Sequence, residues 1–293
     1  GVNIEGIDNV VAGNTVGLNA AGTAAVANSG GVNINNVAGN TIGGTTALAR
    51  NVISGNTNDG ISISGASATG NLVQGNYVGI NAAGTSAIAN TNAGVSIQSS
   101  ATGNTIGGAI AGAGNVISGN QSTGVYVNAA NNTLSGNIIG LDAAGTAKVA
   151  NAGSGVDVTS AGTGSMIGGT TASARNVISG NGGDGIVVDG GGSSTARNVV
   201  IQGNYIGTDI SGSSALSNSR HGVYLYNAAA SNTVGGTVSG AGNVISGNAS
   251  YGVLIEGINN SVAGNTVGLN AAGTAAISNS TGIYVNNVGS NTI

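Results

Sequence analysis

Few side chains in this sequence could perform acid–base chemistry, and the largest group of them falls within residues 157–226. The whole chain of 293 residues has nine Asp and Glu, five Lys and Arg, and one His. Asp157 and Asp189 are carboxylates of the type that act in pairs on glycosidic bonds. His221, with carboxylates nearby in sequence, could serve as an acid or a base. Four further residues complete this group: Asp184, Arg220, Tyr224 and Tyr226.

Whether these residues meet depends on the elements that carry them, and the sequence repeats almost from end to end. GVNIEGIDNVVAGNTVGLNAAGTAAVAN at 1–28 returns as GVLIEGINNSVAGNTVGLNAAGTAAISN at 252–279. Between them, NVISGN begins at residues 51, 115, 176 and 243. A recurring unit makes each copy nearly the same piece of structure, so the fold depends on how the copies stack.

A shorter unit of roughly 30 residues lies inside this repeat. It begins with a G-[VI]-x-[ILV] segment, and alternate units carry an AAGT loop or a GG loop followed by NVISGN. In the unit that begins at Gly94, apolar residues between Gly and Asn predict three strands, at 95–97, 105–106 and 116–117. No stretch has a sustained helical stripe.

Three strands per turn cannot bury their apolar side chains alone, so the turns must stack into three parallel sheets around an aliphatic column. We therefore expect an all-β chain: a right-handed parallel β-helix (solenoid) of about ten turns, forming one continuous domain over 1–293. The ends look like cuts through a longer array, because solenoids usually carry polar caps. The third-strand row of the column is predicted as Val26, Ile53, Ile88, Ile117, Val149, Ile178, Leu216, Ile245 and Ile277.

Asparagine recurs at two positions of every turn, where it predicts corners. Asn tolerates the left-handed conformation of a sharp corner, and stacked copies can hydrogen-bond amide to amide along the axis. The row that closes the third strand is predicted to form a structural ladder: Asn28, Asn56, Asn90, Asn120, Asn151, Asn181, Asn218, Asn248 and Asn279. A second row precedes the second strand: Asn9, Asn40, Asn71, Asn104, Asn132, Ser165, Asn198, Asn232, Asn260 and Asn291.

The GI-x-I segment, the N-x-[VI]-x-GN segment and the Asn rows resemble the right-handed parallel β-helix repeats of bacterial surface and secreted proteins. Pectate-lyase-like polysaccharide enzymes share this fold. The resemblance covers the whole chain and implies the fold, because the matching residues are structural. It also implies that the sheet of first strands is the one that related enzymes use.

The predicted register brings the chemical residues named above onto or beside one outer face, within three neighbouring turns. One interpretation is a polysaccharide lyase, hydrolase or epimerase with Asp157, Asp189 and His221 as catalytic residues. A second is a glycan-binding module that uses tyrosines without catalysis: Tyr126, Tyr224, Tyr226 and Tyr284. A third is that repeat drift on a solvated face placed a few charges together.

Composition and charge exclude several classes of binding partner. A net charge of −4 with Lys148 as the only lysine argues against nucleic acid and anionic membranes, which attract clustered Lys and Arg. No Cys and a single His argue against an ordinary zinc site, so neither a metal nor a cofactor is expected. No apolar run is long enough to be inserted in a membrane.

These features favour a non-enzymatic structural rod, located extracellularly or at the cell surface, as part of an adhesin or filament protein. Its expected partner is self: a second copy stacked end to end into a fibre, or a continuation of the same chain. Glycans are a further expected partner if the outer face binds them.

Overall fold

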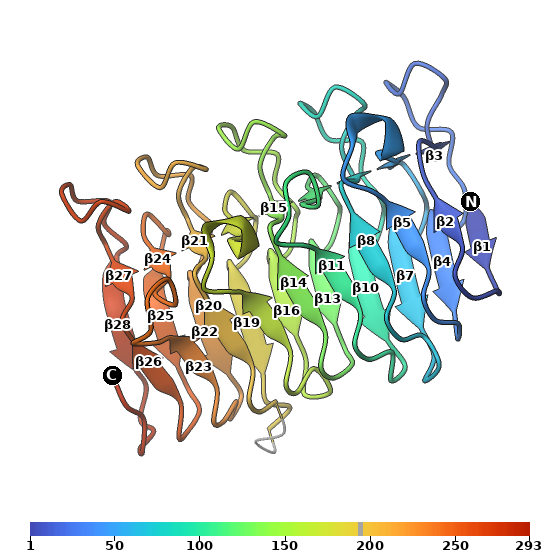
Figure 1. The fold of residues 1–293 in the computed structure, drawn as a ribbon. Helices are drawn as coiled ribbons and strands as arrows, with labels where there is room; N and C mark the ends of the chain where they lie inside the picture. The colour runs from blue at the N-terminus through green and yellow to red at the C-terminus, as the bar shows by residue number, and fades with distance from the viewer. Residues whose placement is uncertain (193–195) are drawn as a thin grey trace.

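The computed structural model describes residues 1–192 and 196–293, and in this part the chain is built almost entirely from short strands. It coils into a rod of stacked turns whose two termini lie at opposite ends (Figure 1). Two 3₁₀ helices, η1 (Ala47–Ala49) and η2 (Ala172–Ala174), sit in loops at one edge of the rod. No helix in the described ranges has the length and apolar character that crossing a bilayer requires.

The strands form three sheets, in which neighbouring strands come from successive turns. The first sheet contains β1 (Val2–Ile4), β4 (Val32–Asn35), β7 (Ile61–Ser64), β10 (Val95–Gln98), β13 (Val125–Val127), β16 (Val156–Val158), β19 (Ile186–Asp189), β22 (Val223–Tyr226), β25 (Tyr251–Ile255) and β28 (Thr281–Val285). The second contains β2 (Val10–Val11), β5 (Thr41–Gly43), β8 (Leu72–Gln74), β11 (Thr105–Gly107), β14 (Thr133–Ser135), β17 (Met166–Gly168), β20 (Val200–Gln202), β23 (Thr233–Gly235) and β26 (Ser261–Ala263). The third contains β3 (Thr15–Val16), β6 (Val52–Ile53), β9 (Tyr77–Val78), β12 (Val116–Ile117), β15 (Ile138–Ile139), β18 (Val177–Ile178), β21 (Tyr205–Ile206), β24 (Val244–Ile245) and β27 (Thr266–Val267).

The predicted parallel β-helix is therefore confirmed, with strands paired in parallel from turn to turn. The described part has ten strands in the first sheet and nine in each of the others. This corresponds to nine three-strand turns and the first strand of a tenth, close to the ten turns expected. Rungs of such a stack are spaced about 4.8 Å apart.

One column of aliphatic side chains fills the interior. In the second sheet the pairing register joins Val73, Ile106 and Leu134, as predicted, and all three are fully buried. In the first sheet the inward residues alternate with outward ones, because successive side chains of a strand point to opposite faces. Val156 and Val158 of β16 are buried for this reason, while Asp157 between them faces outward.

The predicted third row of the column is wrong in every second turn. Its strand-borne members come from the GN-x-[VI]-G segments: Val16 pairs with Ile53, and Ile53 with Val78. The AAGT loops follow these strands and form small hairpins, closed by bridges such as Leu18 to Ala25. The residues predicted from those loops lie outside the strands: Val26, Ile88, Val149, Leu216 and Ile277.

Asparagine ladders run along all three corners of the rod. The first predicted ladder is continuous, with each Nδ2 donating to the Oδ1 of the next turn, as in Asn28 to Asn56 at 3.1 Å and Asn120 to Asn151 at 2.8 Å. A third ladder, not predicted, precedes the third sheet and is also continuous: Asn14, Asn51, Asn76, Asn115, Asn137, Asn176, Asn204, Asn243 and Asn265.

The second predicted ladder breaks where its sequence pattern weakens. The Ser165 hydroxyl accepts from the Asn132 backbone N–H, at 3.2 Å. Asn198 then leaves the row, and the Val199 N–H takes its place by donating to Asn232 Oδ1 at 3.0 Å. Asn198 instead adopts a left-handed conformation, with φ of 57°.

At several corners the left-handed conformation predicted for the ladder asparagine belongs instead to the residue before it. Gly119, directly before Asn120, has φ of 78°, and Asn131, directly before Asn132, has φ of 57°. The ladder side chain is thereby directed along the axis, where it bonds to its own copy. The corner uses two residues, one for the turn and one for the ladder.

Replacing Ile106 or Ile178 by Asp should unfold several neighbouring turns, because both side chains are fully buried and a buried carboxylate would have no partner there. Circular dichroism on heating will show loss of the native transition. Leu48→Asp is the control, since Leu48 is 92% exposed. A native-like melting temperature for Ile106→Asp and Ile178→Asp would contradict the described core.

Asn120→Ala should lower the free energy of unfolding by roughly 1–3 kcal/mol, because it leaves buried ladder partners unpaired. Asn120 receives from Asn90 and donates to Asn151. Denaturant titration measures the change, with exposed Gln121→Ala as the matched control. Equal stability of the two variants would show that the ladder is dispensable.

Candidate functional site

The outer face of the first sheet carries most of the residues singled out by their chemistry. The register lines up one outward position of successive turns, so that Tyr126 pairs with Asp157, Asp157 with Val187, and Val187 with Tyr224. Two residues further along the strands, Asp189 pairs with Tyr226. The structure thus brings these residues together on one face, within neighbouring turns, as the register predicted.

A hollow of about 470 Å³ lies on this face and is called here the carboxylate hollow. Strands β16, β19 and β22 and the corners before them supply its walls. Its lining combines three carboxylates, one guanidinium and two phenols with two smaller residues: Ser154, Asp157, Asp184, Val187, Asp189, Arg220, Tyr224 and Tyr226.

Asp157 has the most perturbed carboxyl group of the hollow. Burial, together with the negative charges of Asp189 and Asp184, raises its pKa from 3.8 to about 6. The described residues form no hydrogen bond with the Asp157 carboxyl group, so nothing offsets the effect of burial on its pKa. A carboxylic acid with such a pKa is partly protonated near neutrality and can donate a proton, as catalytic acids do.

Asp189 and Asp184 are each held in place by hydrogen-bond donors. Asp189 Oδ1 accepts from the Gly191 N–H at 2.8 Å and from Asn227 Nδ2 at 3.1 Å. Asp184 Oδ1 accepts from the His221 N–H at 2.9 Å, and its Oδ2 lies 3.5 Å from Arg220 Nη1. The hollow thus holds one carboxyl group with a raised pKa beside two that accept hydrogen bonds from neighbouring residues.

His221 lies behind this hollow rather than in its lining. Its ring is stacked on Tyr251 with centroids 5.1 Å apart and meets Tyr224 edge-on at 5.2 Å. Burial lowers its pKa, against the opposing attraction of Asp184. The structure therefore places the His221 ring against Tyr224, with its Nε2 4.0 Å from Asp184 Oδ1. The acid–base role of His221 stays a prediction.

Aromatic rings continue the face beyond the carboxylate hollow. Tyr224 and Tyr226 have centroids 4.9 Å apart, and Tyr251 is stacked on Tyr284 at 5.1 Å. The Tyr224 hydroxyl donates to Glu256 Oε2 at 2.7 Å. Burial and this bond to Glu256 raise the Tyr224 pKa, which keeps the phenol protonated. Of the four predicted tyrosines, only Tyr126 is separated from this aromatic cluster.

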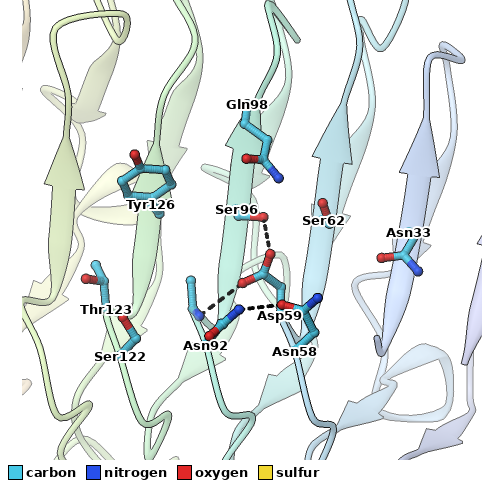
Figure 2. Close-up of a pocket in the computed structure, with 11 residues that line it drawn as sticks. Asn33, Asn58, Asp59, Ser62, Asn92, Ser96, Gln98, Ser122, Thr123 and Tyr126 are labelled. Carbon is cyan, nitrogen blue, oxygen red and sulfur yellow. Dashed lines mark hydrogen bonds between the residues drawn. The ribbon is translucent and has the colours of Figure 1, made fainter. Parts of the chain in front are cut away.

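Tyr126 belongs to a second hollow on the same face, of about 430 Å³, called here the Asp59 hollow. Figure 2 shows Asp59 at its base, bonded to Ser96 and surrounded by amide and hydroxyl side chains. Sequence analysis did not select Asp59, Glu256 or Tyr251. The signal was present for Asp59, because it occupies the same place in its turn as Asp184, two residues before a first-sheet strand.

No set of three or more His, Cys, Asp or Glu side chains within 1–192 and 196–293 is arranged to hold a metal ion.

No protein-family model matches the chain, and no curated protein matches it. Among solved structures, it is similar to the crystal structure of alginate lyase from Paenibacillus sp. str. FPU-7, with a TM-score of 0.37 and 15% sequence identity. That alignment covers 87% of this chain and 89% of the lyase chain. A similarity of this size says nothing about activity.

The raised pKa of Asp157 predicts a stability change with a definite sign. The native state keeps this proton up to about pH 6, whereas an unfolded Asp releases it near 3.8. The free energy of unfolding should therefore fall as the pH rises between these values. Asp157→Asn should remove this dependence and stabilise the protein at pH 7 by about 1–2 kcal/mol, allowing for solvent screening.

Denaturant titrations from pH 4 to pH 8 will measure this effect. Asp142→Asn is a matched control, because the equivalent loop positions Asn19, Asn81 and Asn270 make the same bonds with an amide. Parallel pH profiles for wild type and Asp157→Asn would contradict the electrostatic description of the hollow.

Proposed function

We propose that this chain is a carbohydrate-active β-helix that cleaves glycosidic bonds in a polysaccharide bound on the outer face of its first sheet. The observation that carries the proposal is the carboxylate hollow, where Asp157 and Asp189 share one cavity with Arg220 and two tyrosines. An assembly of converging carboxylates beside aromatic rings supports the enzyme alternative better than a purely structural rod.

The placement of the two carboxylates suits hydrolysis. Asp157 pairs with Val187, and Asp189 lies two residues further along the same neighbouring strand. The spacing of rungs and residues puts their Cα atoms about 8 Å apart. Both side chains project from the outer face of the sheet, so their carboxyl groups can approach the separation of about 5–9.5 Å that glycoside-hydrolysing enzymes use.

In this proposal Asp157 is the general acid. It donates its proton to the glycosidic oxygen while the bond from that oxygen to the sugar's anomeric carbon breaks. The Asp189 carboxylate supports the opposite side of the reacting carbon, as a base for the attacking water or as a nucleophile. Arg220 and the His221 backbone N–H hold Asp184, and its fixed negative charge helps Asp157 to retain a proton.

Charge on the face points to an uncharged substrate. Asp59, Asp157, Asp184 and Asp189 line the two hollows, whereas Arg220 is the single Lys or Arg among the residues lining them. A polymer of uronic acids would meet like charge along this track, and like-charge contact opposes binding. A neutral polysaccharide avoids this repulsion and can lay its sugar rings against tyrosine rings.

Polysaccharide cleavage is tested by the release of reducing ends from neutral glucans, mannans and xylans and from uronic-acid polymers. We expect turnover of a neutral polymer that declines as the pH rises through about 6, where Asp157 loses its proton. Asp157→Asn and Asp189→Asn should each lower kcat/KM by about 100-fold or more, and Asp142→Asn should leave it unchanged. Absence of turnover on every polymer, or turnover indifferent to both substitutions, would contradict the proposal.

The structural rod remains the second candidate, because an aliphatic column and two unbroken Asn ladders run along the described chain. In that case the protein would act as an extracellular or surface spacer whose partner is a second copy or a continuation of the array. Straight fibres in electron micrographs, together with no turnover on the polysaccharide panel, would favour this candidate. Both candidates would act outside the cell.

A further inference from the structure

The Asp59 hollow is lined by polar side chains of four consecutive first-sheet rungs and the corners before them. Figure 2 shows them arranged around Asp59, with Tyr126 at one side and Asn33 at the other. Asp59 is the sole charged residue of the lining, and amides and hydroxyls make up most of the remainder. This composition differs from that of the carboxylate hollow, where charged groups dominate.

Asp59 is fixed at the base of the hollow by the next turn. Its Oδ1 accepts from the Ala93 N–H at 3.1 Å, and its Oδ2 accepts from the Ser96 hydroxyl at 2.8 Å. Burial raises its pKa, while these bonds act in the opposite direction. Each carboxylate oxygen has a further lone pair that can accept a hydrogen bond.

The two hollows are built on equivalent corners. Asp59 and Asp184 each lie two residues before a first-sheet strand and accept a backbone N–H from the equivalent residue of the next turn, Ala93 or His221. The preceding position of that next turn is Asn92 in one hollow and Arg220 in the other. Asn92 donates to Asn58. The Asp59 hollow is thus a version of the same corner without the guanidinium.

Most of the surrounding side chains keep their hydrogen-bonding groups for an external partner. The structure shows no hydrogen bond from the side chains of six of the residues that line the hollow: Asn33, Ser62, Gln98, Ser122, Thr123 and Tyr126. Such groups can donate and accept, so they match a ligand that carries many hydroxyls. With no cation in the lining and one carboxylate at its base, the hollow disfavours an anion.

We propose that the Asp59 hollow is a second sugar-binding site. It holds an uncharged sugar unit whose neighbouring hydroxyl groups donate hydrogen bonds to the Asp59 carboxylate. The amides of Asn58 and Asn92 border these hydroxyls, and the Tyr126 ring provides a surface for the sugar face. Tyr126 pairs with Asp157 on the next rung, so the two hollows adjoin. That the bound sugar belongs to the polymer cleaved at the carboxylate hollow rests on the proposed function. Sugar binding at Asp59 itself does not depend on that function.

The test is an NMR titration of the folded protein with cellohexaose, mannohexaose and xylohexaose. The Ala93 amide signal reports on Asp59, and the His221 amide signal reports on Asp184, because each N–H is bonded to that carboxylate. We expect one of the hexasaccharides to shift the Ala93 signal. Asp59→Asn should raise the Kd measured from that shift at least tenfold, since a charged acceptor is lost, and Asp142→Asn should not change it.

Tyr126→Ala is a second variant, included because Asp59→Asn could lower the stability of the protein. It should also raise the Kd, since the ring that faces the sugar is removed. A silent Ala93 signal with all three hexasaccharides, or an unchanged Kd in both variants, would overturn the proposal. The NMR titration and the cleavage assay can fail independently of each other. An Ala93 response without polysaccharide turnover would remove only the proposed cleavage, whereas turnover with a silent Ala93 signal would remove only this site.

Discussion

The structure depends on one constraint: each turn stacks in register on the next, about 4.8 Å away. A polar side chain that recurs at the same corner of each turn can then bond to its own copy in the neighbouring turn. Asparagine meets this condition because its amide carries both a donor and an acceptor. Where a corner lacks it, as at Ser165, a shorter side chain accepts only the backbone N–H of Asn132 and the side-chain ladder stops.

The two kinds of turn alternate along the rod. An AAGT hairpin appears on every second rung and meets its copy across two rungs. The loops touch through backbone bonds, as in Ala82 N–H to Gly22 O at 3.0 Å and Ala143 N–H to Gly84 O at 2.8 Å. These contacts lie in the row of loops along one edge of the rod (Figure 1).

Periodicity predicted the elements whose role recurs in each turn. The first and second strands, their register and the ladder from Asn28 to Asn279 all follow from repeated residue types. The third strand was misplaced because Val26 and Ile53 both lie shortly before a ladder Asn, although a hairpin separates Val26 from its strand. Sequence spacing does not distinguish an inserted loop from a strand when both end in an aliphatic residue.

The candidate site was only partly predictable, because it depends on what differs between turns. Register placed Asp157, Asp189 and Tyr224 on one face, but it did not indicate that the His221 ring would pack behind Tyr224. Nor did it indicate that Asp59 would bond to Ser96, on the strand that follows its own in the sheet. Such contacts depend on side-chain directions, which a repeat pattern does not specify.

A solenoid can create a site only by departing from its repeat on an outward position, since inward and corner positions are held by the column and the ladders. Stacking then forces the new groups close together, and like charges on adjacent rungs oppose each other. Asp157 shows the consequence, because burial and its acidic neighbours raise its pKa. The ladder before β16 remains unbroken, from Asn120 through Asn151 to Asn181, whereas the corner after β16 is the one where Ser165 interrupts the second ladder.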